Sequence, residues 1–337
     1  MSALDNIVDR IRGLDLERRL GLTPNYPPVA IEFDRQDVTL VRLKKGRRNT
    51  LSLEAHQALP MPEQTVSASV LRPTLGAPEE LAKRVQELFT KTGTKPGRVS
   101  LVLPDNLAKV SLLTLPEKPA SSKQLDEIVR FKMKRAVPFR LEEASMAYQV
   151  LEGGEGKTCS VLVILLRKYM IEQYEQILAD SGAQVGLVDL STTNVFNLCR
   201  DEIATASAAE GDVALLNCTP SYFSMLIVRN GRLIFYRCKS YAGGDESEAQ
   251  LQSVMSREIA TSLSYYREKL DGEGIRTVFV RSTAQSLDTL EEILGRHEIE
   301  RVELVDPSKA LEMVEGMRID PVVGQRMAPA IGAAAGR

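Results

Sequence analysis

The sequence predicts an α/β protein of two similar units, with a compact α+β module inserted between them. One observation is a repeat: two apolar strands joined by a short polar turn occur at 29–43 and again at 213–228. Another is the β-β-α-β-β-α-β alternation across 97–190, which is typical of an α+β module and not of a continuous parallel sheet. The length of 337 residues, 43% of them hydrophobic, fits about two globular domains.

Composition excludes several classes of protein. The 43 Lys and Arg residues against 45 Asp and Glu give a net charge of −2, so no domain-wide positive field is available for nucleic acid. No run approaches the roughly 20 apolar residues of a membrane-spanning helix. The four cysteines lack metal-site or redox spacing, and two histidines offer little for zinc or for a catalytic triad. We therefore expect no nucleic acid, no membrane span and no metal.

Residues 1–28 are predicted to form an N-terminal amphipathic helix and a linker. Leu4, Ile7, Val8, Ile11 and Leu14 follow a helical spacing, and the prolines before residue 29 break the chain. The helix suits a membrane surface or a partner, and the alternative is that it packs on its own protein or frays.

Residues 29–96 are predicted to begin the first unit. The β-rich runs 29–33 and 38–43 form a hairpin, 50–58 adds a third strand, and a helix from 78 to 89 begins with a proline. In the inserted module, 97–190, the strands 98–103 and 112–115 precede a helix that Ser121 and Ser122 cap and that stops before Pro138. Strands near 146–151, 159–166 and 184–190, with a helix at 169–180, complete the module.

Residues 191–320 are predicted to form the second unit. A helix at 192–206 leads to strands at 212–217 and 222–228, and Asn230-Gly231 favours a type I′ hairpin into the strand 232–237. A long helix at 246–270 is followed by the strand 277–280, the helix 287–296 and the strand 301–304. The Gly/Ala-rich residues 321–337 are predicted to be a flexible tail.

Four stretches in this order resemble PilM, the actin-like protein of the type IV pilus inner-membrane platform and a relative of the cell-division protein FtsA. They are 29–43, 129–150, 183–194 and 213–244, the last of which ends in Tyr-Ala-Gly-Gly. The resemblance implies a two-lobed actin-like (ribonuclease H-like) fold with an inserted small α+β subdomain and a reduced second small subdomain.

The first phosphate loop departs from the pattern of this family. Where relatives have roughly Gly-Ile-Asp-Ile-Gly, this chain has Ala30-Ile31-Glu32-Phe33-Asp34. Both glycines are replaced, so backbone amides lose close access to a phosphate. Asp34 would repel a polyphosphate by a few kcal/mol at about 4 Å. Glu32 keeps the charge of the family's metal-associated aspartate but is one methylene longer.

The other nucleotide positions are also altered. In the second loop Asn217 replaces a carboxylate, Thr219 replaces a glycine and Pro220 removes a backbone donor. At the adenosine site, Arg281, Ser282 and Thr283 replace Ala-Gly-Gly. Gly243 and Gly244 are followed almost at once by a helix, which leaves little room for the cleft wall of relatives. We expect no catalytic residues and no cofactor, with ATP and magnesium as the alternative.

The resemblance implies a cytoplasmic protein, peripheral to the inner membrane, that binds the cytoplasmic N-terminus of a PilN-like membrane protein and links it to the pilus motor without ATP hydrolysis. In this family the peptide lies against the α+β module and the first unit. The predicted partner-binding residues are on one helix: Arg130, Phe131, Lys134 and Arg135. A merely solvated helix face is the alternative for them. A nucleotide-regulated actin-like ATPase, a cytoplasmic component of a type II secretion platform, and a homo-oligomer also stay open.

Overall fold

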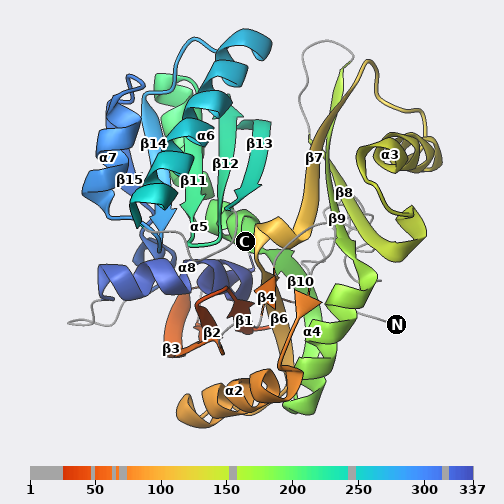
Figure 1. The fold of residues 1–337 in the computed structure, drawn as a ribbon, viewed down its shortest axis with the longest axis vertical. Helices are drawn as coiled ribbons and strands as arrows, with labels where there is room; N and C mark the ends of the chain where they lie inside the picture. The colour runs from red at the N-terminus through yellow and green to blue at the C-terminus, as the bar shows by residue number, and fades with distance from the viewer. Residues whose placement is uncertain are drawn as a thin grey trace.

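The computed structural model describes residues 26–46, 50–62, 66–67, 74–151, 158–241, 248–312 and 319–336. Almost all of the predicted N-terminal helix and linker (1–28) therefore lies outside the described residues. Two five-stranded sheets form two lobes, and a three-stranded sheet projects beside them (Figure 1).

The first lobe is built on a sheet in the order β10-β6-β1-β2-β3. Strands β1, β2 and β3 are antiparallel neighbours, whereas β6 and β10 run parallel to β1. Helices α2 and α4 cover one face of this sheet, where apolar side chains of both helices and of the strands share one core. The bounds are β1 Val29–Phe33, β2 Asp37–Lys45, β3 Leu51–Pro60, α2 Pro78–Lys91, β6 Arg98–Leu103, α4 Lys168–Asp180 and β10 Gln184–Leu190, with the short pair β4 Val66–Ser67 and β5 Thr74–Leu75.

The second lobe repeats this topology. Its order is β13-β12-β11-β14-β15, with three antiparallel strands followed by two parallel ones. The predicted repeat is thereby confirmed, because β11 takes the place of β1 and β14 the place of β6. The bounds are α5 Ser191–Glu210, β11 Val213–Cys218, β12 Tyr222–Arg229, β13 Arg232–Ser240, α6 Glu248–Lys269, β14 Thr277–Ser282, α7 Leu287–Gly295, β15 Arg301–Leu304 and η4 Pro307–Ala310. Seven residues, 241–247, separate β13 from α6 in the sequence, which is little length for a second small subdomain.

The predicted flexible tail, 321–337, is helical over 321–335, which corrects the prediction. Pro321–Ala335 form helix α8, capped by the Asp320 side chain, and most of its residues are buried. With α5 it fills the space between the two sheets (Figure 1). A Cβ at Gly332 would lie 2.3 Å from the Asn194 carbonyl oxygen of α5. The small residues that suggest mobility in the sequence are what let the two helices approach this closely.

The inserted module is smaller than the predicted range 97–190. It comprises β7 (Ala108–Leu115), α3 (Ser122–Ala136), η3 (Leu141–Glu143), β8 (Ala144–Leu151) and β9 (Cys159–Arg167), with the strand order β7-β9-β8. Strands β6 and β10 and helix α4, which the prediction assigned to the module, belong to the first lobe. The reason is that β6 pairs with β1 and carries core residues of that lobe.

None of the described helices is both long enough and apolar enough to cross a membrane.

Candidate functional site

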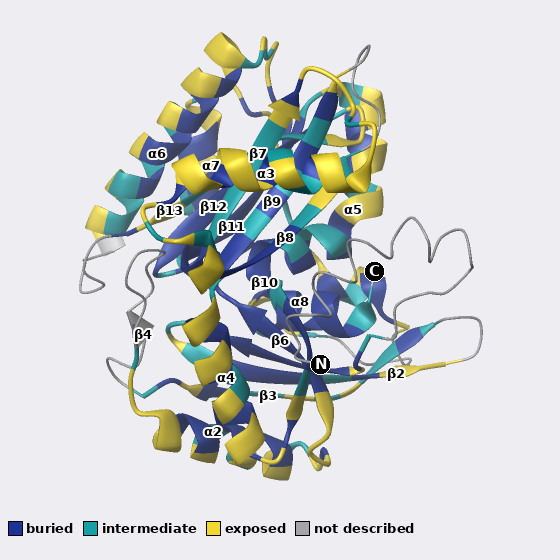
Figure 2. Ribbon diagram, turned by 90° about the vertical axis from the view of Figure 1, so that its right-hand side faces the viewer, coloured by how far each residue is buried: buried dark blue, intermediate teal, exposed yellow. Residues whose placement is uncertain are grey.

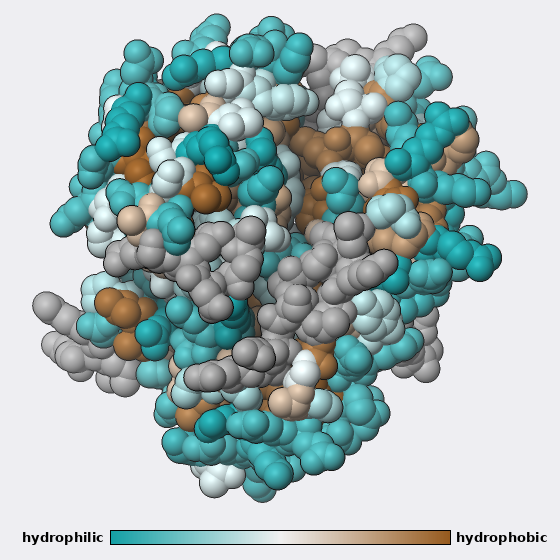
Figure 3. All heavy atoms as spheres, viewed as in Figure 1, coloured by the Kyte–Doolittle hydropathy of each residue, from teal (hydrophilic) through white to brown (hydrophobic). Residues whose placement is uncertain are grey.

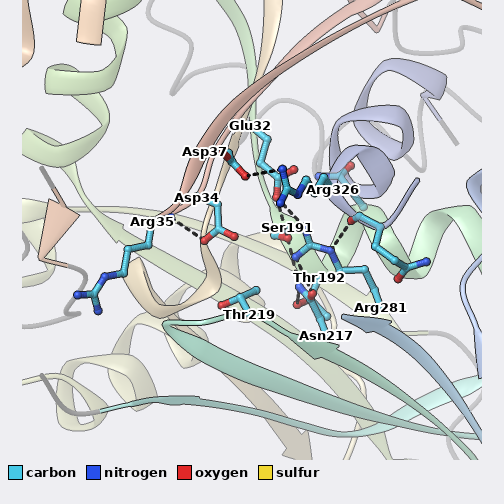
Figure 4. Close-up of polar contacts among 12 residues, drawn as sticks. Glu32, Asp34, Arg35, Asp37, Ser191, Thr192, Asn217, Thr219, Arg281 and Arg326 are labelled. Carbon is cyan, nitrogen blue, oxygen red and sulfur yellow. Dashed lines mark hydrogen bonds and ion pairs between the residues drawn. The ribbon is translucent and has the colours of Figure 1, made fainter. Parts of the chain in front are cut away.

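The degenerate nucleotide-site positions of the sequence meet at a crevice where the first strands of both lobes end. Glu32 is next to last in β1, and Asn217 holds the same place in β11. Arg281 is the direct neighbour of Asn217 on the parallel strand β14. The repeated topology thus brings three polar residues from distant parts of the chain to one point (Figure 4).

The Arg281 side chain fills the crevice. Arg281 as a whole residue is 1% exposed, and its guanidinium points at acceptors from three directions (Figure 4). Nε donates to the Gln325 carbonyl oxygen of α8 at 2.8 Å, and Nη1 donates to Asn217 Oδ1 at 3.1 Å. Nη2 lies 3.8 Å from Glu32 Oε1 in the first lobe. A buried cation with partners in both lobes and in α8 therefore occupies the place between the two loops.

The N-terminus of α5 completes the network. The Ser191 hydroxyl donates to Glu32 Oε1 at 3.3 Å, and the Asn217 amide donates to Thr192 Oγ1 at 2.8 Å. Every one of these groups is at least nine-tenths buried. Because buried polar groups are costly unless paired, the network stabilises one closed arrangement of the two lobes.

The backbone amides of both loops are already engaged within the chain. In the first loop, Asp34 N donates to the Asp37 carbonyl at 2.9 Å, and Arg35 N donates to Asp34 Oδ1 at 2.7 Å. In the second, the Thr219 hydroxyl accepts from Tyr222 N at 3.1 Å and from Ser221 N at 3.3 Å. Phosphate loops bind anions through such amides when they are free. The amides named here are instead satisfied within their own loops.

The space left in the crevice is about 10 Å³. That is room for a single water molecule, whereas ligand pockets usually measure some hundreds of Å³. The lining is Glu32, Asp34, Gln36, Asp37, Thr39, Arg281, Thr283 and Arg326.

Burial dominates the electrostatics of Glu32. Loss of solvation raises the pKa of this carboxyl to about 8, against the opposing attraction of Arg281, while Asp34 adds a further upward shift. Oε2 has no hydrogen-bond partner among the described residues. Burial also raises the pKa of Asp34. The crevice thus presents carboxyl oxygens and a guanidinium whose donors already face acceptors of the chain, a poor environment for a triphosphate.

A second buried carboxyl, Asp105, lies in the 3₁₀ turn η2 (Asp105–Leu107), which joins the first lobe to the inserted module. Its Oδ1 accepts from Thr192 N at 3.0 Å, and its Oδ2 accepts from Ser224 Oγ at 2.6 Å and Tyr236 Oη at 2.8 Å. Burial raises the pKa of Asp105, and these hydrogen bonds oppose the rise. This single residue holds the start of α5 and two strands of the second lobe against η2.

The structure brings some of the predicted nucleotide-site residues together and not others. Glu32, Asp34 and Thr283 line the crevice, and Asn217 contacts Arg281. Ala30 is fully buried in the core between the sheets. The Ser282 amide donates to Gln325 Oε1 at 3.1 Å, and Thr219 closes its own turn. The remaining two predicted positions, Gly243 and Gly244, lie outside the described residues.

The predicted partner-binding residues Arg130, Phe131, Lys134 and Arg135 are all exposed on α3. Helix α3 itself lies on the outer side of the inserted module (Figure 2). Their role in binding a partner stays a prediction.

The sequence did not predict that Arg281 is the central group of the crevice. It also did not predict the roles of Asp105 and Gln325. The signal for Arg281 was a lone cation at the end of the apolar strand Thr277–Ser282. Nothing in the sequence indicated that Asp105 or Gln325 would be buried, because both lie in short polar stretches.

Comparisons with known proteins agree with this architecture. The family model described as "Type IV pilus assembly protein PilM" matches residues 30–255, more than half of the chain. A solved structure, a PilM-PilN type IV pilus biogenesis complex, is similar at 18% identity and a TM-score of 0.75, over 93% of this chain and 98% of that one.

More distant structures include a Bacteroides thetaiotaomicron protein with an actin-like ATPase fold, at 10% identity and a TM-score of 0.47, over 84% of this chain and 91% of that one. The cytoplasmic domain of EpsL from Vibrio cholerae matches at 11% identity and a TM-score of 0.45, over 77% of this chain and 83% of that one. A search of curated protein sequences finds no significant match. On the family match, this chain belongs to the PilM family of type IV pilus assembly proteins and has its two-lobed, actin-like fold.

Proposed function

We propose that this chain is a nucleotide-independent scaffold of a type IV pilus platform. The observation that carries the proposal is the buried Arg281 side chain, which donates to Asn217 and Gln325 and faces Glu32 where a nucleotide would have to lie. The self-satisfied loops and the residual space of about 10 Å³ support it. A protein closed in this way has no need of ATP to join its lobes, because its own side chains do so.

The proposed partner is the cytoplasmic N-terminal segment of a PilN-like inner-membrane protein. Support comes from the similar structure, which is a complex of PilM with PilN. In this proposal the chain lies in the cytoplasm, peripheral to the inner membrane, and links that segment to the pilus motor. A preformed surface of a rigid scaffold loses little conformational entropy on binding, which favours affinity without a nucleotide.

Calorimetry tests the partner. A synthetic peptide of the PilN-like N-terminus is titrated into the full chain, with and without ATP and magnesium. The proposal expects the same Kd in both titrations. If the peptide and a scrambled control peptide both give no heat of binding, the PilN-like segment is not the partner.

Thermal unfolding tests the claim of nucleotide independence. A nucleotide at 100 times its Kd would stabilise the folded state by about 2.7 kcal/mol and raise Tm by several degrees. The proposal expects no shift with ATP and magnesium. A clear rise would support the alternative, a nucleotide-regulated ATPase.

A further inference from the structure

The outer face of α3 carries a basic surface around one exposed aromatic ring. Phe131 is 59% exposed, the most of any aromatic side chain among the described residues. Arg135, one turn later, places its guanidinium carbon 4.6 Å from the centre of the Phe131 ring. Lys132 and Lys134 are exposed beside them. We call Phe131, Lys132, Lys134 and Arg135 the α3 ridge.

The charge of this region opposes that of the whole chain. Residues 117–140 contain seven Lys and Arg residues against three Asp and Glu, whereas the protein as a whole has a net charge of −2. Arg130 pairs with Asp126 at 2.7 Å. In the part of the chain that the structure describes, no carboxylate forms an ion pair with Lys132 or Lys134. The region therefore keeps a net positive field toward solvent.

The shape of the surface is convex. Leu125, Val129 and Met133 point inward and are buried against the three-stranded sheet. At 100° per residue, Phe131 falls on the opposite side of the helix. Helix α3 lies at the outer edge of the molecule in Figure 1 and crosses the front of Figure 2 with its exposed side outward. In Figure 3, hydrophilic residues gather at the right-hand edge, where this helix lies.

We infer that the α3 ridge binds the surface of an anionic phospholipid bilayer. Lysine and arginine next to an anionic leaflet contribute about 1 kcal/mol each, and clusters of four to eight bind such lipids. The three basic residues of the ridge belong to such a cluster, the seven exposed Lys and Arg residues of 117–140. An aromatic ring among them suits the interface between headgroups and acyl chains. A projecting helix ridge meets a flat surface along its length, whereas an extended peptide needs a groove or a free strand edge. The inference stands on these residues and does not rest on the proposed function.

Vesicle sedimentation with the full chain tests the inference. The probes are phosphatidylcholine vesicles with and without phosphatidylglycerol. The test variant is Lys132→Glu/Lys134→Glu/Arg135→Glu. The matched control, Lys269→Glu/Arg276→Glu/Arg296→Glu, changes the net charge equally at exposed positions of the second lobe. Residues 1–28 are present in every variant, so any membrane contact of that segment is common to all of them.

We expect binding to the anionic vesicles only, at least about tenfold weaker in the α3 variant and within twofold of the natural chain in the control. Raising the salt from 0.1 to 1 M shortens the Debye length from about 10 to 3 Å and should release the protein. Phe131→Ser should weaken binding several-fold and leave its salt dependence in place.

Three results would each overturn the inference. They are equal binding to neutral vesicles, equal losses in the two triple variants, and no binding to either vesicle. If vesicles never bind and the α3 variant instead loses affinity for the PilN-like peptide, the ridge is a peptide surface, as the sequence predicted. Circular dichroism melts of all variants establish that they are folded.

Discussion

Replacing Arg281 by methionine tests whether the crevice is held closed by its own cation. Arg281→Met keeps an unbranched apolar chain in the space but removes the donors to Gln325 at 2.8 Å and to Asn217 at 3.1 Å. It also removes the partner of Glu32 at 3.8 Å. Water cannot replace all three contacts, because the Arg281 side chain is buried and only 2% exposed.

The expected loss of stability is about 3 kcal/mol. Each hydrogen bond from a charged donor contributes roughly 1.5–3 kcal/mol, and breaking a buried ion pair on one side usually costs about 3–5 kcal/mol. The lower end applies here because Glu32, with a pKa of about 8, is already mostly protonated at neutral pH, so losing Arg281 leaves little unpaired charge. A methionine in the same space also limits the cavity.

Urea unfolding followed by circular dichroism measures the loss, with Arg296→Met as the control. Arg296 is exposed, directly follows α7 and pairs with Glu292 of that helix, so its replacement should cost less than about 0.5 kcal/mol. Combining Arg281→Met with Glu32→Gln gives a double-mutant cycle, in which we expect a coupling of about 1–3 kcal/mol. A cost below about 1 kcal/mol for Arg281→Met, or a cycle with no coupling, would refute the view that this pair joins the lobes.

Three further predictions concern pH, a buried carboxyl and a helix contact. Burial raises the pKa of Glu32 in the folded state to about 8, so its contribution to the free energy of unfolding is full below about pH 4.5 and is lost as pH rises toward 8. Glu32→Gln should therefore make the free energy of unfolding, measured by urea titration, less dependent on pH over that window. Asp105→Asn replaces one carboxylate oxygen, a hydrogen-bond acceptor, by an NH₂ group that faces other donors. It should lower the free energy of unfolding by about 2 kcal/mol in urea, and an unchanged midpoint would contradict this. Gly332→Ala should cost about 1–3 kcal/mol, because its Cβ would lie 2.3 Å from the Asn194 carbonyl oxygen, whereas Gly295→Ala, with nothing within 4 Å, should be nearly neutral in the same thermal melts.

Local signals in the sequence were enough to predict most helices and strands. Ser121 caps α3 by accepting from Gln124 N at 3.1 Å, and Asn230 and Gly231 both have positive φ, as a type I′ turn requires. The repeat of strand, turn and strand identified the two lobes because each sheet uses the same order of strands. These features depend on neighbouring residues, and for that reason a single sequence shows them.

The features that the sequence did not show depend on long-range packing. Glycine and alanine in 321–337 are compatible with a mobile tail and with a tightly packed helix, and only the presence of α5 decides between the two. The predicted module 97–190 was too wide because β6 and β10 look like any other apolar strands until their pairing with the first sheet is known. Arg281 meets Glu32 across 249 positions of the chain, so no spacing could indicate their contact.

The altered loops and the buried arginine have one physical explanation. A nucleotide joins two such lobes by offering negative charge to amides on both sides. In this chain the polarity is reversed: a cation from β14 lies at the centre, and the groups that face it are oxygen acceptors from β1, β11 and α8. Glu32 and Asn217, which appear in the sequence only as damaged nucleotide positions, are in the structure the partners of Arg281. In the proposed scaffold, the substituted loop positions thus supply the contacts between the lobes that a nucleotide would otherwise provide.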